Sequence, residues 1–143
     1  FIQNLNEPLK KIVQDAGNAI MEVYKKDDFE STIKSDGSPV TEADNNANKI
    51  IIDALKEITP KVPIVSEETY KKESDIPKTP YWLVDPLDGT REFLNKSKDF
   101  TVNIALIENT DSILESYVPQ HQTRHGLDLN LIFLAMKKRY QIV

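Results

Sequence analysis

The feature that most constrains this chain is an apolar run that ends at two aspartates, within residues 82–90, WLVDPLDGT. The run from 81 to 84 is typical of a buried strand. Asp85 and Asp88 follow it with a proline between them, and Asp88 with Gly89 forms a dipeptide that is common in turns. We therefore predict a strand that stops at an acidic turn, where two carboxylates converge.

Such a turn offers the ligands that a hard cation prefers. Carboxylates, a main-chain carbonyl and water are the usual ligands of Mg²⁺. Gly89 would let another group approach the backbone closely, with the hydroxyl of Thr90 beside it. An ordinary turn is the alternative, because Asp-Pro and Asp-Gly pairs are frequent without any metal, and these residues alone leave it open. An EF-hand is excluded, since its alternating ligands and distal Glu are missing.

Composition narrows the class of protein. The chain has 143 residues, is 39% hydrophobic and 29% charged, and so fits one globular domain. Its net charge of −5 argues against a nucleic-acid partner, which would need a basic face. It has no cysteine, which excludes disulfides and fits a reducing compartment, so we expect a cytoplasmic protein and leave peripheral contact with the inner membrane open. No apolar run approaches the ~20 residues that span a bilayer.

Hydrophobic periodicity predicts two helices and several strands. Apolar residues recur at helical spacing over 5–24 and again over 41–58. Thr41 is the expected N-cap of the second helix, with Asp44 in a capping-box position. Strands are expected, in chain order, over 29–34, 62–66, 81–84, 100–107, 113–118 and 129–136. We predict a layered α/β fold, in which two long helices pack on one face of a mostly antiparallel sheet.

Three ordered motifs resemble the inositol monophosphatase superfamily, which comprises Mg²⁺-dependent, lithium-sensitive phosphomonoesterases. Residues 82–93, WLVDPLDGTREF, resemble its signature. Residues 34–44, KSDGSPVTEAD, resemble the segment before its second helix, and 65–68, VSEE, resemble its acidic pair. Residues 99–107, DFTVNIALI, are similar to one branch, the bacterial 3′(2′),5′-bisphosphate nucleotidases of sulfur assimilation. The resemblance covers about residues 5–119 and implies the N-terminal part of that fold.

The resemblance implies a metal site made of carboxylates. At the matching positions, Glu67, Asp85 and the backbone carbonyl of Leu87 would hold the first Mg²⁺. Asp85 and Asp88 would bridge to the second ion. Glu68 also matches the motif, and we expect it to lie behind these ligands.

The resemblance also implies how water and substrate are held. Thr90, supported by Asp44, would orient the attacking water. Backbone N–H groups at Gly89 and Thr90 would receive phosphate oxygens, with Glu67 also beside the substrate. Asp44 has a structural alternative, because an acid in a first helical turn favours the helix dipole, and both roles can coexist. Lys34 would lie near the pair that activates water.

The implied activity is hydrolysis of the 3′-phosphate of adenosine 3′,5′-bisphosphate to AMP and phosphate. Inositol monophosphatase specificity and an inactive metal-binding remnant are the alternatives. The superfamily completes its site with a Trp-Asp-x-x-Ala-Gly motif on a second domain, and the only tryptophan here is Trp82. We therefore expect a truncated form with low turnover that lacks the second domain. Self-association is left open.

We expect residues 1–119 to form the metal-binding domain and 120–143 a divergent segment of the same domain. In that segment His121 and His125 are four residues apart and could share a helix face. Their polar surroundings favour a loop over a histidine metal site.

Overall fold

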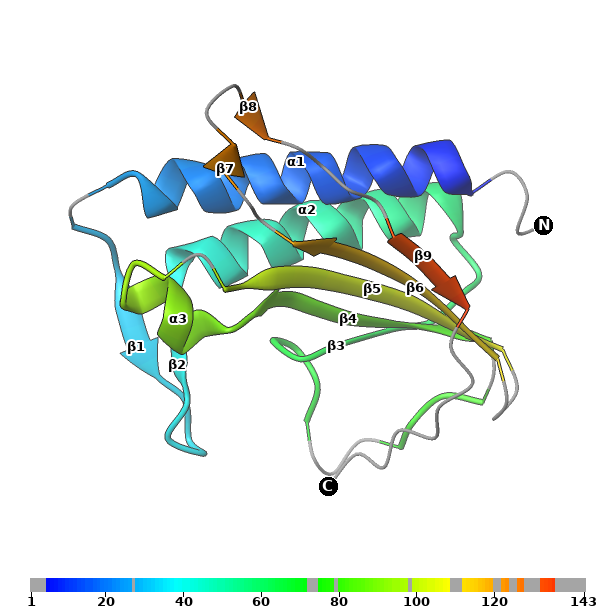
Figure 1. Ribbon diagram of the computed structural model, residues 1–143. Helices are drawn as coiled ribbons and strands as arrows, with labels where there is room; N and C mark the ends of the chain where they lie inside the picture. Colours follow the sequence, from blue (N-terminus) through cyan, green and yellow to red (C-terminus); the bar gives the residue numbers. More distant parts are fainter. Residues whose placement is uncertain are drawn as a thin grey trace.

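Two long helices cover one face of a five-stranded sheet in the computed structural model of this chain (Figure 1). The helices, α1 (Asn6–Tyr24) and α2 (Glu42–Ile58), lie side by side across the strands. The structure describes residues 5–26, 28–71, 75–78, 80–97, 99–108, 112–119, 122–123, 126–127 and 132–135, with side chains as far as residue 107.

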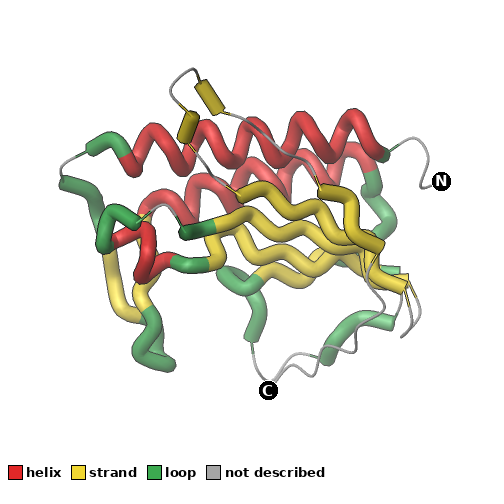
Figure 2. Tube along the Cα trace, in the orientation of Figure 1, coloured by secondary structure: helices red, strands yellow, loops and turns green. Residues whose placement is uncertain are grey.

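The sheet is antiparallel except at one edge. Its strand order is β3-β4-β5-β6-β9, and β3 runs parallel to β4 while the other neighbours are antiparallel. Figure 2 shows the strands in yellow, with the two long helices in red on one side of them. The strands are β3 (Ile64–Ser66), β4 (Tyr81–Asp88), β5 (Thr101–Glu108), β6 (Ser112–Pro119) and β9 (Ile132–Ala135). The predicted α/β architecture is thus confirmed.

Three smaller elements complete the described chain. The hairpin of β1 (Ser31–Ile33) and β2 (Pro39–Thr41) lies at one end of the sheet, beside the short helix α3 (Thr90–Leu94) (Figure 1). The strands β7 (Gln122–Thr123) and β8 (Gly126–Leu127) pair where a loop was predicted.

The core forms between the helices and the sheet. Alternate residues of β4 and β5 point toward the helices, because successive side chains of a strand face opposite ways. Trp82 is fully buried there, and its Nε1–H donates to the hydroxyl of Thr59, just past the end of α2, at 2.8 Å. The largest fully buried side chains are Trp82, Phe93, Leu9, Ile20, Ile51, Leu55, Ile104, Leu106, Val13, Val23, Val84 and Val102.

The predicted start of α2 is confirmed. Thr41 caps the helix, because its hydroxyl oxygen accepts from the backbone N–H of Ala43 at 3.1 Å. The carboxylate of Asp44 accepts from the backbone N–H of Thr41 at 2.8 Å, which completes the capping box.

The predicted end of the acidic strand is wrong. β4 does not stop at residue 84 but continues through the aspartates to Asp88. Asp85 pairs with Asn103 and Asp88 pairs with Thr101. The chain therefore advances by three residues on β4 where it advances by two on β5. The extra residue is a bulge, a place where a strand tolerates proline.

Other expectations fall outside what the structure tests. His121 and His125 lie outside the described residues. The division at residue 119 stays a prediction. Among the described residues, no helix is long and apolar enough to cross a membrane.

Candidate active site

The parallel pairing of β3 with β4 brings two of the predicted acidic residues together. Ser66 is in register with Val84, and the backbone N–H of Glu67 donates to the carbonyl of Val84 at 2.9 Å. Parallel strands advance in the same direction, so the residues that follow these two are also neighbours. Glu67 therefore lies beside Asp85, although the two are distant in the sequence.

The bulge in β4 places Asp85 and Asp88 on the same face of the sheet. In a regular strand, residues three apart would point to opposite faces. Their partners, Asn103 and Thr101, are two apart on β5 and share a face. Asn103 donates from Nδ2 to Oδ2 of Asp88 at 3.3 Å. The motif did not predict this contact, because it depends on the register of the bulge.

Asp85 is the least satisfied polar side chain of the site. Its Oδ1 is buried and has no hydrogen-bond partner within the described structure. Burial, the negative charge of Glu67, a hydrogen bond with the Glu67 side chain and the charge of Asp88 together raise the pKa of Asp85 to about 8. A carboxylate in these surroundings is stabilised by a proton or a cation.

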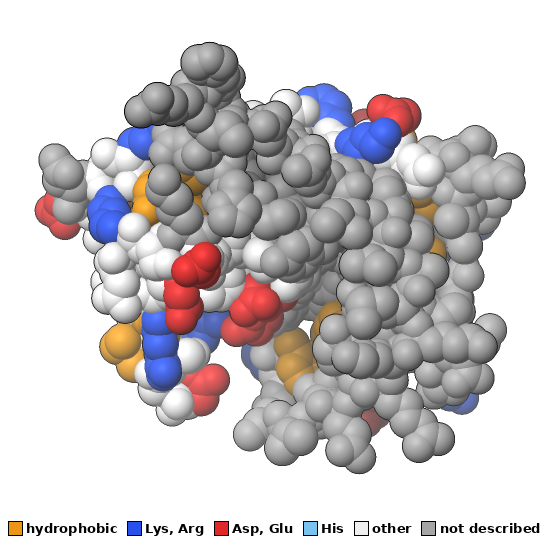
Figure 3. All heavy atoms as spheres, viewed as in Figure 1, with side chains coloured by type: hydrophobic (Ala, Val, Ile, Leu, Met, Phe, Trp, Pro, Cys, Tyr) orange, Lys and Arg blue, Asp and Glu red, His pale blue; other side chains and the backbone are white. Residues whose placement is uncertain are grey.

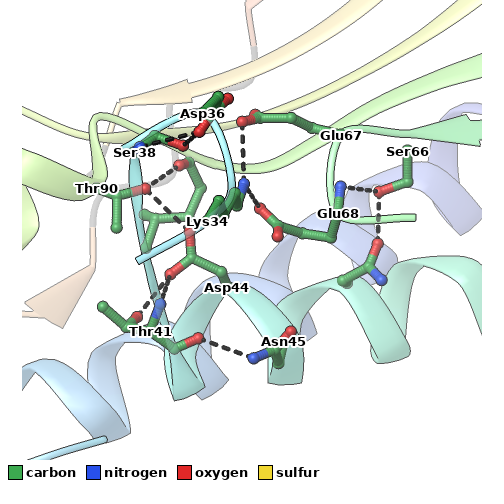
Figure 4. Close-up of polar contacts among 12 residues, drawn as sticks. Lys34, Asp36, Ser38, Thr41, Asp44, Asn45, Ser66, Glu67, Glu68 and Thr90 are labelled. Atoms are coloured by element: carbon green, nitrogen blue, oxygen red, sulfur yellow. Dashed lines mark hydrogen bonds and ion pairs between the residues drawn. The ribbon is translucent and has the colours of Figure 1, made fainter. Parts of the chain in front are cut away.

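Asp44 and Thr90 meet, as the resemblance implied. The hydroxyl of Thr90 lies 2.9 Å from Oδ1 of Asp44 and 3.1 Å from the carbonyl oxygen of Leu87, and both are acceptors (Figure 4). The other oxygen of Asp44 accepts from the backbone N–H and the hydroxyl of Thr41, at 2.8 and 2.6 Å. Asp44 thus links the start of α2 to the start of α3.

Lys34 connects the β1–β2 hairpin to the acidic pair after β3. Its Nζ lies 2.8 Å from Glu68 and 3.2 Å from Glu67, and Figure 4 shows it between them. Burial lowers the pKa of Lys34, but hydrogen bonds and charges from both glutamates outweigh burial and raise it. Burial raises the pKa of Glu68, and Lys34 partly offsets that effect. Glu68 is thus a buried partner of Lys34, and Glu67 is the more exposed of the two.

Gly89 sets the approach of the chain to α3. Its φ is +93°, in the left-handed region that favours glycine. A Cβ at this position would lie 2.8 Å from the carbonyl oxygen of Asp99. No other residue fits here without moving the backbone, so the entry to Thr90 depends on glycine.

The residues fit a hard cation in their chemistry, while the set of side-chain ligands is incomplete. Glu67, Asp85 and Asp88 offer carboxylate oxygens, which a hard cation binds, and Oδ1 of Asp85 is buried without a hydrogen-bond partner in the described structure. In the part of the chain that the structure describes, no three Asp, Glu, His or Cys side chains are arranged to hold a metal ion. In the space-filling view, acidic and basic side chains gather beside α3 and the β1–β2 hairpin (Figure 3).

Comparison with known proteins identifies the family. The profile described as "Inositol monophosphatase family" matches residues 2–115. The chain belongs to the inositol monophosphatase family. It is 47% identical over 100 residues to the 3′(2′),5′-bisphosphate nucleotidase CysQ of Buchnera aphidicola, covering 68% of this chain and 38% of that protein. It is 46% identical over 108 residues to CysQ of Escherichia coli K12, covering 73% and 43%.

Solved structures of other proteins share the fold. The extragenic suppressor protein suhB of Bartonella henselae superposes with a TM-score of 0.69 at 26% identity, covering 81% of this chain and 45% of that chain. A staphylococcal inositol monophosphatase-1 superposes with a TM-score of 0.72 at 17% identity, covering 83% and 45%. This chain therefore spans less than half the length of each of these four proteins.

Proposed function

We propose that this chain carries the metal-binding part of a Mg²⁺-dependent phosphomonoesterase. The observation that supports this most is the buried, unpartnered oxygen of Asp85 beside Glu67. Two neighbouring carboxylates that repel one another are a common feature of sites that bind a cation. The Asp44–Thr90 contact lies next to them, joined through the carbonyl of Leu87.

In this proposal Glu67, Asp85 and the carbonyl of Leu87 hold the first Mg²⁺, and Asp85 with Asp88 holds the second. When bound, such ions stabilise the charge on a phosphate group and make a nucleophile available near neutral pH. The hydroxyl of Thr90 has one proton, and when it is donated to Asp44 the carbonyl of Leu87 is left free to bind a cation. Asp88 would have to exchange its contact with Asn103 for this role.

Thr90 has a separate task in the same proposal. Its hydroxyl has one proton, and donating it to Asp44 leaves the oxygen able to accept a hydrogen bond from water. Asp44 is held by two other donors, the backbone N–H and the hydroxyl of Thr41, so it fixes the direction of the Thr90 hydroxyl. A water that donates to Thr90 would thereby be oriented for attack. The backbone N–H groups of Gly89 and Thr90 are the proposed contacts of the phosphate.

The substrate we propose is adenosine 3′,5′-bisphosphate, hydrolysed to AMP and phosphate. Relatives that are 46–47% identical over most of this chain are named 3′(2′),5′-bisphosphate nucleotidase. Inositol monophosphate is the alternative substrate within the same family. We also propose a cytoplasmic location, since a chain without cysteine suits a reducing compartment. Self-association stays a prediction that size-exclusion chromatography tests.

Mg²⁺-dependent phosphate release is the test of this function. The chain is incubated with adenosine 3′,5′-bisphosphate and, in parallel, with inositol 1-phosphate, and phosphate is measured with and without Mg²⁺. Asp88→Asn serves as the control variant, because it removes one proposed ligand charge. Release from the nucleotide by the wild type and not by Asp88→Asn would support the proposal.

An inactive remnant is the second candidate, and it predicts a different result. It is favoured because, among the described residues, no three Asp, Glu, His or Cys side chains are arranged to hold a metal ion. A remnant would bind Mg²⁺ in a calorimetric titration without releasing phosphate from either substrate. Phosphate release together with no Mg²⁺ dependence would contradict both candidates.

A further inference from the structure

We propose that Asn48 is a positioning residue for the acidic turn that follows β3. Within the described structure its side chain hydrogen-bonds to none of the four proposed ligands of the cations, and it acts through Ser66, the last residue of β3. The inference deepens the proposed function and rests on it, because the turn carries Glu67.

The contact runs from α2 to the turn through one hydroxyl. Ser66 is fully buried, and its Oγ donates to Oδ1 of Asn48 at 2.6 Å. Oγ of Ser66 also accepts a weak hydrogen bond from the backbone N–H of Glu68, at 3.4 Å. The carbonyl of Ser66 accepts from the N–H groups of Thr69 and Tyr70 at 3.0 and 2.7 Å. Ser66 is therefore the fixed point around which the turn with both glutamates is built (Figure 4).

Asn48 shares a helix face with Asp44. Residues four apart on a helix lie one above the other, with Cβ atoms about 5–6 Å apart. Asp44 holds Thr90 at the start of α3, and Asn48 holds Ser66 at the end of β3. One face of α2 thus sets the positions of two turns that come from different parts of the sequence. We infer that α2 fixes the spacing between the proposed water-orienting group and the proposed ligand Glu67.

This spacing matters because metal sites tolerate little displacement. Groups that orient a ligand from behind commonly change metal affinity by 10–100-fold when they are removed. Asn48 also satisfies the buried hydroxyl of Ser66, which any buried hydroxyl requires. That structural role alone would lower stability and leave the Mg²⁺ affinity of the folded protein unchanged. The two roles are therefore separable by experiment.

The test compares four variants of the full chain by calorimetric titration with Mg²⁺. Asn48→Ala and Ser66→Ala remove the two sides of the contact, and we expect each to weaken Mg²⁺ binding about 10-fold or more. Asn48→Asp keeps an oxygen that can accept from Ser66 and should recover most of the affinity. Asn46→Ala, at an exposed position on the same helix, is the matched control and should bind within about twofold of the wild type. Ser66→Ala removes a single oxygen and serves if Asn48→Ala does not fold.

Two results would overturn the inference. Mg²⁺ affinities of Asn48→Ala and Ser66→Ala within twofold of the wild type would do so, while the proposed function would stand. No Mg²⁺ binding by the wild type would overturn the proposed function instead. If the wild type does not bind Mg²⁺, the amide NMR chemical shifts of Glu67 and Glu68 in the metal-free protein test the positioning. Shifts that change in Asn48→Ala but not in Asn46→Ala would support the inference. Unchanged shifts in Asn48→Ala are the second result that would overturn it.

Discussion

Two aspartates of the site are treated in opposite ways by the fold. Asp44 is buried, and both of its oxygens accept hydrogen bonds, from Thr41 and from Thr90. Asp85 has a buried oxygen without a donor in the described structure, and its neighbours Glu67 and Asp88 are also negative. Both residues are expected to serve one site, yet within the described structure Asp44 has a donor for each of its oxygens and Asp85 does not.

The difference between Asp44 and Asp85 distinguishes a carboxylate that supports the fold from one that is suited to bind a ligand. A carboxylate whose oxygens are all occupied holds its neighbours in place and contributes to stability. A buried carboxylate with an oxygen that lacks a hydrogen-bond partner lowers the stability of the fold. Such a group is found where a bound ligand offsets this loss. The same kind of residue is thus used once to build the fold and once to prepare for a cation. Each of the following substitutions tests one side of this comparison.

Replacing Asp44 should have the largest effect. Asp44→Ala removes the capping box, the acceptor of the Thr41 hydroxyl and one of the two acceptors of the Thr90 hydroxyl, so the free energy of unfolding should fall by about 2–4 kcal/mol. Asp44→Asn keeps one acceptor oxygen and should lose less. Urea denaturation measures both. A loss below about 0.5 kcal/mol for Asp44→Ala would show that Asp44 does not support the fold.

Replacing Gly89 should have the next largest effect. Gly89→Ala places a Cβ at 2.8 Å from the carbonyl of Asp99 at a φ of +93°, and should cost about 2–3 kcal/mol while displacing Thr90 from Asp44. Gly37→Ala is the control, because its φ is +84° with nothing within 4 Å of the new atom, and it should cost about 1 kcal/mol. Equal losses in thermal denaturation would mean that the close approach at Gly89 is unimportant.

Local sequence signals predicted the parts that depend on near neighbours. The helical periodicity of 5–24 and the Thr41–Asp44 capping box are confirmed, because both act within one or two turns of a helix. The family resemblance added the meeting of Thr90 with Asp44, which is now visible as a 2.9 Å contact. The ligand and catalytic roles of these residues stay predictions.

Contacts set by strand register were beyond such signals. The sequence pattern predicts a strand that ends at residue 84 with the aspartates in a turn, whereas in the structure they continue β4 through a bulge. Pro86 was the signal available, because proline inside a sheet marks an edge or a bulge. The contact of Asn103 with Asp88 and that of Asn48 with Ser66 join separate elements. The position of Asn48, four residues after Asp44, places both side chains on one face of α2. That spacing is the sequence signal for a role of Asn48 near the site.

Replacing Lys34, which pairs with the acidic residues after β3, should lower the free energy of unfolding by a moderate amount. Lys34→Met keeps the apolar stem but leaves Glu68 buried without its donor, and should cost about 1–2 kcal/mol of unfolding free energy. Lys49→Met is the control, since its ion pair with Asp53 is exposed and should contribute under about 0.5 kcal/mol. Glu68→Gln in the Lys34→Met background should recover part of the loss. Equal effects of the two lysine substitutions in urea denaturation would contradict the burial of this pair.

Replacing Asp85 should have the smallest effect, with the opposite sign. Asp85→Asn removes a buried negative charge and provides an amide that can donate to Glu67, so without Mg²⁺ the free energy of unfolding should rise by about 1 kcal/mol. The gain should grow with pH. The pKa of Asp85 is raised in the folded protein, which therefore binds more protons than the unfolded chain between about pH 4 and 8, and the wild type loses stability as pH rises through this range.

Mg²⁺ should reverse the order of the two proteins. A cation that binds only the folded state stabilises it in proportion to the logarithm of its concentration above the dissociation constant. The wild type should therefore gain thermal stability with added Mg²⁺, and Asp85→Asn should not, so their melting curves should cross at a defined Mg²⁺ concentration. An Asp85→Asn variant that is less stable than the wild type without Mg²⁺ would mean that Asp85, like Asp44, supports the fold. The contrast between the two aspartates would then fail.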